Sequence, residues 1–325
     1  MMIDPASKKS RPNLMPPIWL MGLLALMCGA VIAWRIPALL KAIEERRSLG
    51  PDALSTNGFT LTDDLMADPT LIRFGAPEEV IPIDEPRIWN VEMVDELGAN
   101  PRTRFLVSDS EVLGVVIDGR SRAYPLRILQ WHEVVNDTLN GVELGVVYHP
   151  LSETSTVFHR PASADGDPLV FGSSGLVVDC CLLMHERLGP GKRTSESLWS
   201  PTDGEAISGI RAGEHLSLVP FQLTSWKKWR EQHPDTDVLG MAESHRRYYK
   251  KEPFRPYRLI DRPRYPYSPQ PPAGPRANLS RVMITRQGDR WVASSESFTS
   301  TQPATAQVVS SWFAVHAREI PGLDP

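Results

Sequence analysis

The chain lacks a cysteine framework and lacks an excess of basic charge. Three cysteines occur in 325 residues: Cys28 lies in an apolar segment, and Cys180 and Cys181 are adjacent, which is poor geometry for a disulfide between them. We therefore expect no disulfide scaffold. The formal net charge is −4, and without an overall basic field we expect no nucleic-acid partner.

The sequence contains no clear internal repeat, and it predicts few long helices. No segment of roughly 20–50 residues recurs. The chain contains 30 prolines, about twice average usage, which favours turns and irregular connections over a helical bundle. Apolar residues make up 41% and charged residues 23% of the chain, so the composition is that of an ordinary globular protein with one large or two modest domains.

Side chains that are charged at neutral pH are absent between Arg11 and Arg35. The intervening PPIWLMGLLALMCGAVIAW is close to the roughly 20 apolar residues that a membrane-spanning helix needs. Trp19 and Trp34 lie near its ends, where indole rings favour the membrane interface. We expect a transmembrane anchor over residues 12–35.

A cleaved secretory signal is the alternative for this segment. Such a signal has a shorter apolar region that ends in a small-x-small cleavage site, and Cys28-Gly29-Ala30 is a poor version of one. Met27 is not the small residue that lipidation at Cys28 would require. We therefore favour the uncleaved anchor.

Basic residues flank the segment on both sides, so the positive-inside count does not decide its orientation; they are Lys8, Lys9 and Arg11 before it and Arg35, Lys41, Arg46 and Arg47 after it. Most of the chain follows the segment, and a short basic N-terminus before an apolar run is typical of export. We expect a single-pass protein of the bacterial cytoplasmic membrane, with residues 1–11 cytoplasmic and the C-terminal domain extracytoplasmic.

Four further regions are expected after the anchor. A juxtamembrane helix and linker covers residues 36–56, where Gly50-Pro51 stops the helix, and the main globular domain covers residues 57–250. Eight prolines among residues 251–277 predict an arm that is neither regular helix nor regular sheet. A C-terminal hairpin over residues 278–325 completes the domain.

Turn dipeptides between apolar runs predict the strands. Asp118-Gly119 and Asn140-Gly141 each separate two such runs, which is a strong local signal for a β-hairpin. Gly288-Asp289 predicts a further hairpin, and VVSSWFAV near the C-terminus predicts a returning strand. We therefore expect a β-rich α+β fold with mainly antiparallel sheet.

Only short helices are expected within this fold, besides the one N-terminal transmembrane helix. One begins after Pro125, and another covers residues 224–233 and ends at Pro234. Trp226 and Trp229 on the second helix are expected in the core, where their large apolar area stabilises most.

The candidate site surrounds His132 and His149, on segments that the Asn140-Gly141 hairpin joins. With His159 as the third imidazole, a zinc or copper ion is the candidate metal. A small polar ligand is the alternative, with contacts from His132, Glu133, Asn136, Asp137, Ser152 and Trp199. The commoner role of such residues is structural: His132 and Glu133 would hydrogen-bond the backbone of a turn that Asn136 and Asp137 cap.

Three stretches resemble known functional motifs, but each lacks a residue that its motif requires. His132-Glu133-Val134-Val135-Asn136 has an asparagine where the zinc-protease helix needs its second histidine. Gly189-Pro190-Gly191-Lys192-Arg193 lacks the first glycine and the magnesium-binding hydroxyl of a phosphate loop, and we expect an exposed, mobile turn there. Gly172-Ser173-Ser174-Gly175 lacks the final glycine of a nucleophile elbow, and we expect a turn where two backbones approach closely.

Several motifs together resemble a known family. In order they are RAYPLRILQWHEVVND, YHPLSETSTVF, FGSSGL, SLW, GEAISG and TSWKKW with HPDT, over roughly residues 60–260, with WFAV near the C-terminus. They are similar to the prokaryotic domain of unknown function 3179. The resemblance implies no activity, because the family has none assigned, but it implies an exported or membrane-anchored protein.

One departure from the family pattern matters for function. The pattern reads Tyr-Cys-Pro-Leu-Cys-Gly-Thr where this chain has His149 and Ser152 in place of the two cysteines, so a dithiol role is excluded in this copy. Three readings stay open: a membrane-anchored extracytoplasmic binding domain, an enzyme with a histidine base oriented by Glu133 or Asp137, and an inactive relative.

Overall fold

The computed structural model describes residues 27, 56–100, 103–260, 263, 265–266, 268, 279–287, 290–294, 305–311 and 315. The chain divides into two units, residues 1–53 and 54–325, and the architecture below is that of the second. The expected anchor over residues 12–35 lies, except for Met27, outside the described residues, as do residues 1–11 and 36–55. Within the described part of the chain, no helix has the length and apolar character to span a membrane.

Three sheets form the body, each named here after one of its strands. The β3 sheet contains, in spatial order, β16 (Thr305–Ala306), β12 (Phe221–Ser225), β3 (Glu111–Ile117), β4 (Arg120–Pro125), β13 (Asp237–Leu239) and β2 (Ile88–Trp89). The β6 sheet contains β15 (Arg290–Ser294), β14 (Arg281–Gln287), β17 (Val308–Ser311), β7 (Thr154–His159), β6 (Val142–His149) and β5 (Val134–Leu139). The β8 sheet contains β1 (Ile72–Arg73), β8 (Phe171–Val178), β9 (Cys181–Glu186), β10 (Leu198–Trp199) and β11 (Ala206–Ser208).

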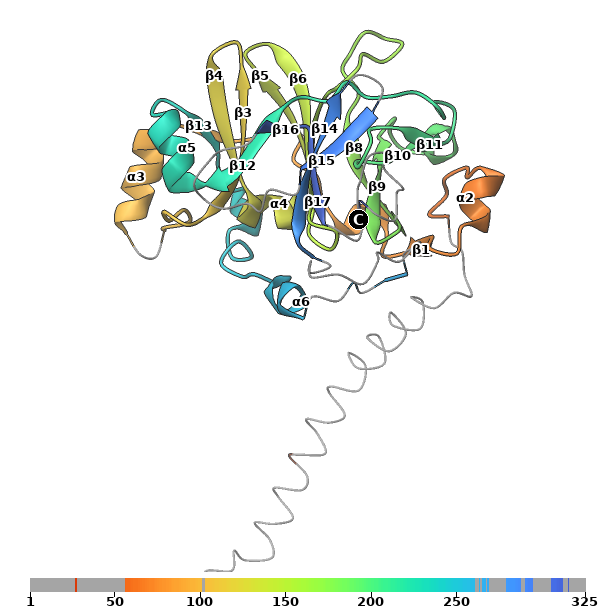
Figure 1. Ribbon diagram of the computed structural model, residues 1–325, viewed down its shortest axis with the longest axis horizontal. Coiled ribbons are helices and arrows are strands. Elements are labelled where there is room, and N and C mark those ends of the chain that lie inside the picture. The colour runs from red at the N-terminus through yellow and green to blue at the C-terminus, as the bar shows by residue number, and fades with distance from the viewer. Residues whose placement is uncertain are drawn as a thin grey trace, which may run out of the picture. The chain divides into compact units, whose positions relative to one another are not determined.

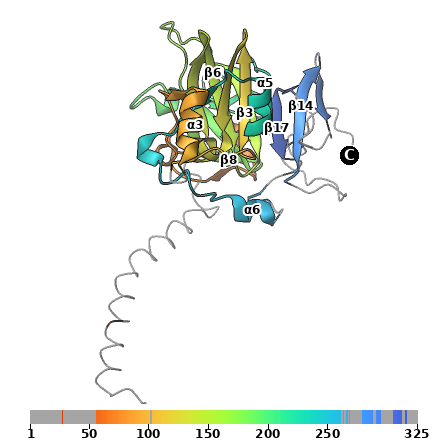
Figure 2. The same ribbon diagram turned by 90° about the vertical axis from the view of Figure 1, so that its left-hand side faces the viewer.

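The helices are short and lie outside these sheets (Figures 1 and 2). They are α2 (Asp63–Ala67), α3 (Val91–Ala99), α4 (Leu126–His132), α5 (Trp226–Gln232) and α6 (Arg255–Leu259), with 3₁₀ turns η1 (Pro77–Glu79), η2 (Arg193–Ser195) and η3 (Glu243–His245). Among the paired strands that the structure describes, only β13 and β4 run parallel. The expectation of a β-rich, mainly antiparallel fold with few short helices is confirmed.

The β6 sheet is buried on both faces, because alternate residues of a strand point to opposite sides. Val135 and Val146 join the core formed with the β3 sheet. Val134 and Val147 join a separate core with Phe171 of the β8 sheet. The β6 sheet is therefore the middle layer, as Figure 1 shows by the succession β3, β6 and β8 across the body.

The predicted hairpins are confirmed. Asp118 and Asn140 both have positive φ, followed by glycines with positive φ, which is the backbone of a two-residue hairpin turn. β14 pairs with β15 around positions 288–289, which themselves lie outside the described residues. VVSSWFAV contributes β17.

The helix predictions have one error. The helix after Pro125 and the helix carrying Trp226 and Trp229 are confirmed, and both indoles are buried. The arm over residues 251–277 was expected to contain no regular helix, but α6 forms within it. Pro256 lies in the first turn of α6, where the amide N–H that proline lacks has no partner within a helix.

Candidate functional site

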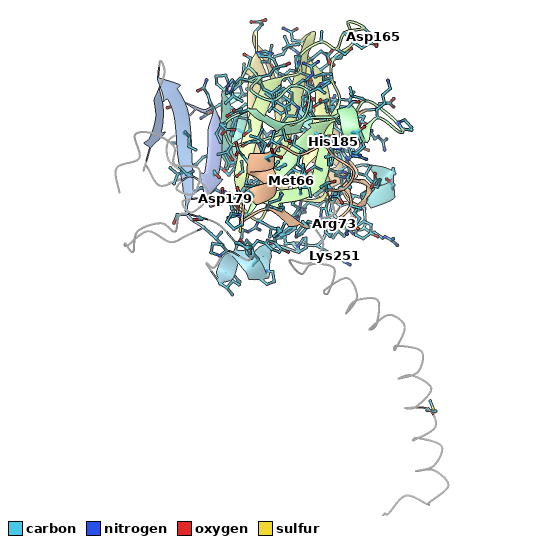
Figure 3. The ribbon with its side chains drawn as sticks, turned by 90° about the vertical axis from the view of Figure 1, so that its right-hand side faces the viewer. Met66, Arg73, Asp165, Asp179, His185 and Lys251 are labelled. Atoms are coloured by element: carbon cyan, nitrogen blue, oxygen red, sulfur yellow. The ribbon has the colours of Figure 1, made fainter. Side chains whose placement is uncertain are left out.

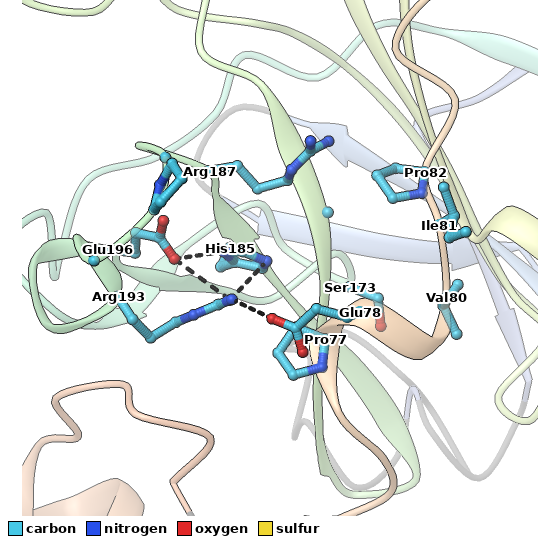
Figure 4. A pocket seen from close by; sticks show the side chains of 14 residues that line it. Pro77, Glu78, Val80, Ile81, Pro82, Ser173, His185, Arg187, Arg193 and Glu196 are labelled. Carbon is cyan, nitrogen blue, oxygen red and sulfur yellow. Dashed lines mark hydrogen bonds and ion pairs between the residues drawn. The ribbon is translucent and has the colours of Figure 1, made fainter.

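A cavity of about 570 Å³ opens between η1 and the end of β9. Its apolar wall comes from Pro77, Val80, Ile81, Pro82 and Pro190. Its polar side comes from Ser173 on β8, His185 on β9, and Arg187, Arg193 and Glu196 in the connection that follows β9 (Figure 4). The volume is that of a typical small-molecule site, and a few polar groups beside an apolar wall are its usual lining.

His185 and Glu196 form a buried pair on the polar side of this cavity. The His185 Nδ1 and Glu196 Oε2 atoms are 2.9 Å apart, and both side chains are nearly inaccessible to solvent. Arg193 Nη1 lies 3.3 Å from the other ring nitrogen, Nε2. Because a guanidinium only donates, Nε2 accepts from Arg193, and the ring proton on Nδ1 is donated to Glu196.

Glu196 is held in its charged form. Burial by itself raises the pKa of Glu196, but hydrogen bonds from His185 and the Leu188 amide, with the charge of Arg193, lower it below the usual range. The Leu188 N to Glu196 Oε1 distance is 2.9 Å. The carboxylate thereby fixes the tautomer and orientation of the His185 ring, as a carboxylate does in a histidine–carboxylate dyad.

Two guanidinium groups beside the pair are balanced by carboxylates nearer to solvent. Arg193 Nη2 lies 2.8 Å from Glu78 Oε1, and the Glu78 side chain is 71% exposed. Arg187 Nη1 lies 2.8 Å from both carboxylate oxygens of Asp84, whose side chain is 41% exposed. Ion pairs this exposed contribute about 0–1 kcal/mol each, so a competing anion could displace either carboxylate at little cost.

Glycine at position 172 allows Arg187 to reach the cavity. A Cβ at Gly172 would lie 2.8 Å from Arg187 Cδ and 3.4 Å from His185 Nε2. Gly172 is directly opposite His185 in the β8–β9 pairing, so a side chain there would occupy the same face. The absence of a side chain at Gly172 therefore leaves the space that Arg187 occupies beside the cavity.

Ser173 connects the cavity to a buried carboxyl group. Ser173 lines the cavity and hydrogen-bonds to Glu133, which is buried behind it. Burial raises the pKa of Glu133 to about 7, although the Ser173 hydrogen bond opposes the shift. Glu133 Oε2 has no hydrogen-bond partner among the described residues, and Glu133 has φ +59°, a conformation that is rare outside glycine and asparagine.

His132, at the end of α4, does not line the cavity. Its Nδ1 donates to the Ile81 carbonyl at 2.7 Å, and its Nε2 accepts from the Tyr249 hydroxyl at 2.6 Å. Burial lowers the pKa of His132, against the hydrogen bond to Ile81. Both ring nitrogens of His132 are thus engaged within the protein.

His149 belongs to a different cluster. Its Nδ1 accepts from the Ser152 hydroxyl at 2.8 Å and from the Leu182 amide at 3.3 Å. Ser152 Oγ also lies 2.8 Å from Thr154 Oγ1. Burial lowers the pKa of His149 to about 3. The structure therefore brings His149 and Ser152 together, but it gives His149 and His132 no common partner.

The remaining predicted residues are dispersed. Asn136 binds the backbone of Phe171 on both its amide atoms, joining β5 to β8. Asp137 accepts from Arg122 and Tyr124 on β4. His159 is exposed at the end of β7, and Trp199 is buried with its indole N–H donated to Glu186. These contacts are structural links between strands.

The zinc or copper ion stays a prediction. Among the described residues, no three histidine, cysteine, aspartate or glutamate side chains are grouped so as to hold a metal. His185, Arg187, Arg193 and Glu196 were missed as site residues, although the rejected stretch 189–193 includes Arg193 and the rejected stretch 172–175 also lines the cavity. Gly175 lies at a bulge in β8, where a Cβ would be 2.2 Å from the Gly75 carbonyl oxygen, and Gly189 and Gly191 form the exposed turn between His185 and Glu196. Charged residues on both sides of a glycine-rich turn were the available signal.

A family model described as "Protein of unknown function (DUF3179)" matches residues 79–319, about three quarters of the chain. This match confirms the resemblance seen in the motifs, and it extends through the C-terminal strands. No curated protein and no solved structure matches the chain.

Proposed function

The chain belongs to the DUF3179 family, whose description assigns no activity, and we propose that its body is a binding domain for a small organic anion. The ligand would occupy the cavity between η1 and β9. The observation that carries the proposal is the arrangement of His185, Arg187 and Arg193 along one side of that cavity, with His185 fixed by Glu196.

The two guanidinium groups support an anionic ligand. Arg187 and Arg193 line the cavity while their carboxylate partners, Asp84 and Glu78, are partly in solvent. Guanidinium groups bind carboxylate and phosphate through paired, charge-assisted hydrogen bonds. A ligand anion can replace the exposed carboxylates and gain a better-shielded contact.

His185 would position Arg193 for the ligand. Its Nε2 accepts a hydrogen bond from Arg193 Nη1, which occupies the one lone pair of that nitrogen, so the contact to the ligand comes from the guanidinium. The apolar side chains of Pro77, Ile81 and Pro82 line the same cavity. A carboxylate or phosphate with a short carbon skeleton combines a group for the guanidiniums with a group for the apolar lining.

Binding should be tested with the purified full chain. Calorimetry against hydroxycarboxylates, sugar phosphates and matched neutral polyols would separate carboxylate from phosphate recognition. We expect an anion to bind, and Arg187→Gln to weaken it by about 10-fold or more, the loss of one charge-assisted hydrogen bond. Arg211→Gln is the matched control, because Arg211 pairs with Glu214 outside the cavity lining. Equal binding by both variants, or binding of neutral polyols alone, would overturn the proposal.

We also propose that residues 12–35 anchor this domain in the bacterial cytoplasmic membrane, with the body on the extracytoplasmic side. The support is the uncharged apolar run with tryptophans near its ends. Carbonate extraction of membranes tests the anchor, and a C-terminal alkaline phosphatase fusion tests the side. A chain released by carbonate, or a fusion that is inactive while a cytoplasmic reporter works, would contradict this placement.

An enzyme acting through His132, Glu133 and His149 has less support. His132 contacts Ile81 and Tyr249, whereas His149 contacts Ser152 and Leu182. A catalytic base and its orienting partner need mutual hydrogen-bond reach, which these residues do not show. An inactive relative remains compatible with ligand binding, since the cavity does not include positions 149 and 152.

A further inference from the structure

We infer that residues 246–260, here called the basic segment, bind an anionic lipid surface. Within it six arginines and lysines stand against one acidic residue, Glu252; the cations are Arg246, Arg247, Lys250, Lys251, Arg255 and Arg258. The whole chain carries a net charge of −4, so this concentration of positive charge is local. Clusters of this size are attracted to anionic membranes at close range.

The basic segment lies at one edge of the body. α6 projects from the lower edge, outside the sheets, in two perpendicular views (Figures 1 and 2). Lys251 lies at the same edge (Figure 3). Four of the six cations are exposed: Arg247, Lys250, Lys251 and Arg255. The positive charge is thus presented outward.

Two aliphatic side chains end the segment in solvent. Leu259 is 76% exposed and Ile260 is 65% exposed, although both are residues that normally favour the interior. Cations beside exposed aliphatic residues are the combination that protein segments use at a lipid interface, because the charges meet head groups and the aliphatic groups enter the acyl boundary. An acidic protein surface would be complementary to the cations but not to the two exposed aliphatic side chains.

Contacts with the rest of the domain fix the inner side of the basic segment. Tyr249 and Tyr257 are buried and hydrogen-bond to His132 and to the Leu151 carbonyl, at 2.6 Å and 2.9 Å. Arg258 turns inward, 3.5 Å from Glu153. Inward tyrosines and outward cations give the segment a fixed outer face, so lipid contact requires little ordering of the chain.

Lipid composition provides the test. The full chain would be placed in nanodiscs of phosphatidylcholine alone or with about a third phosphatidylglycerol, and hydrogen exchange would be measured over residues 246–260. Because the apolar N-terminal run is the same in both discs, a difference between them reports on charge attraction at the body. We expect at least 5-fold slower exchange in the anionic discs, lost at high salt.

Two sets of variants make the test specific. Lys250→Gln, Lys251→Gln and Arg255→Gln together should abolish the slowing in anionic discs. Arg120→Gln, Lys192→Gln and Lys227→Gln, which remove three exposed cations elsewhere, should preserve it. Leu259→Ser with Ile260→Ser should weaken the slowing while keeping its dependence on phosphatidylglycerol.

Other outcomes would overturn the inference. One is equal hydrogen exchange over residues 246–260 in the two kinds of disc. Another is that the control variants lose the slowing as fully as the variants in the basic segment. A third is that soluble polyglutamate or DNA slows exchange while phosphatidylglycerol has no effect. Failure of the membrane anchor would be seen separately, as full-length chain that does not enter discs of either composition.

Discussion

The Ser152 hydroxyl oxygen lies 3.7 Å from the sulfur of Cys181, between the β6 and β8 sheets. Thr154 Oγ1 is at the same distance from this sulfur, and His149 Nδ1 hydrogen-bonds to Ser152. His149 and Ser152 occupy the two positions where the resembled pattern has cysteine. The Cys181 thiol therefore lies beside two residues, His149 and Ser152, that hydrogen-bond to one another, which satisfies buried polar atoms.

Ser152→Cys should form a disulfide with Cys181 under mild oxidation. A sulfur at position 152 would extend further than the hydroxyl and approach the Cys181 sulfur more closely, with a small local adjustment. Thiol counting by mass spectrometry after alkylation checks this.

Ser155→Cys is the control for that substitution. Ser155 is buried on the same strand as Thr154 but points to the opposite face of the sheet. A disulfide in both variants, or in neither, would contradict the placement of Ser152 beside Cys181.

His149 should make the protein less stable in acid. Burial lowers its pKa from 6.5 to about 3, so the unfolded chain binds a proton below about pH 6.5 that the folded chain does not. Stability from this group is complete above pH 6.5 and is lost as pH falls towards 3. Between pH 7.5 and 4.5 the loss is on the order of 2–3 kcal/mol.

Urea unfolding of the full chain and of His149→Gln at these two pH values measures the effect. The variant, which has no titrating ring at position 149, should lose less unfolding free energy than the parent between pH 7.5 and 4.5. Identical losses would mean that the imidazole is solvated.

Glu133 should have the opposite dependence. Burial raises its pKa from 4.5 to about 7, so the folded state binds the additional proton and stability falls as pH rises from about 4.5 to 7. The cost above pH 7 is on the order of 3 kcal/mol. Glu133→Gln, an uncharged group of similar shape, should gain stability relative to the parent at pH 8 but not at pH 4.5, as followed by urea unfolding. A gain that is the same at both pH values would contradict a titrating carboxyl.

Gly172→Ala should weaken ligand binding without unfolding the protein. The new methyl group would push Arg187 away from the cavity, since its Cδ lies 2.8 Å from that position. We expect about 10-fold lower affinity for the anion that calorimetry identifies. Gly98→Ala is the matched control, because no atom lies within 4 Å of the corresponding position on α3. Its affinity should be unchanged, and its stability should rise by about 0.5–1 kcal/mol.

Local signals explain what the sequence could predict. The hairpins at Asp118 and Asn140 follow from two-residue turns that demand positive φ, and the helix with Trp226 follows from its apolar spacing. α6 was missed because proline density was taken to exclude a helix, although the first turn tolerates proline.

Long-range contacts explain what the sequence could not predict. His132 contacts Ile81 and Tyr249, 51 and 117 positions away in the chain, so its ring nitrogens looked available. The cavity combines η1, β8 and the connection after β9, which share no motif. Its residues become a site only when the β8 sheet forms.

The strand β17 enters the β6 sheet between β14 and β7, and Thr154 hydrogen-bonds to Ser310, 156 positions later. During synthesis, β7 therefore emerges well before β17, and the edge of β7 that pairs with β17 stays unpaired until β17 has been made. Truncation before β17 would leave the β6 sheet incomplete, with the edge of β7 exposed and able to pair with other chains.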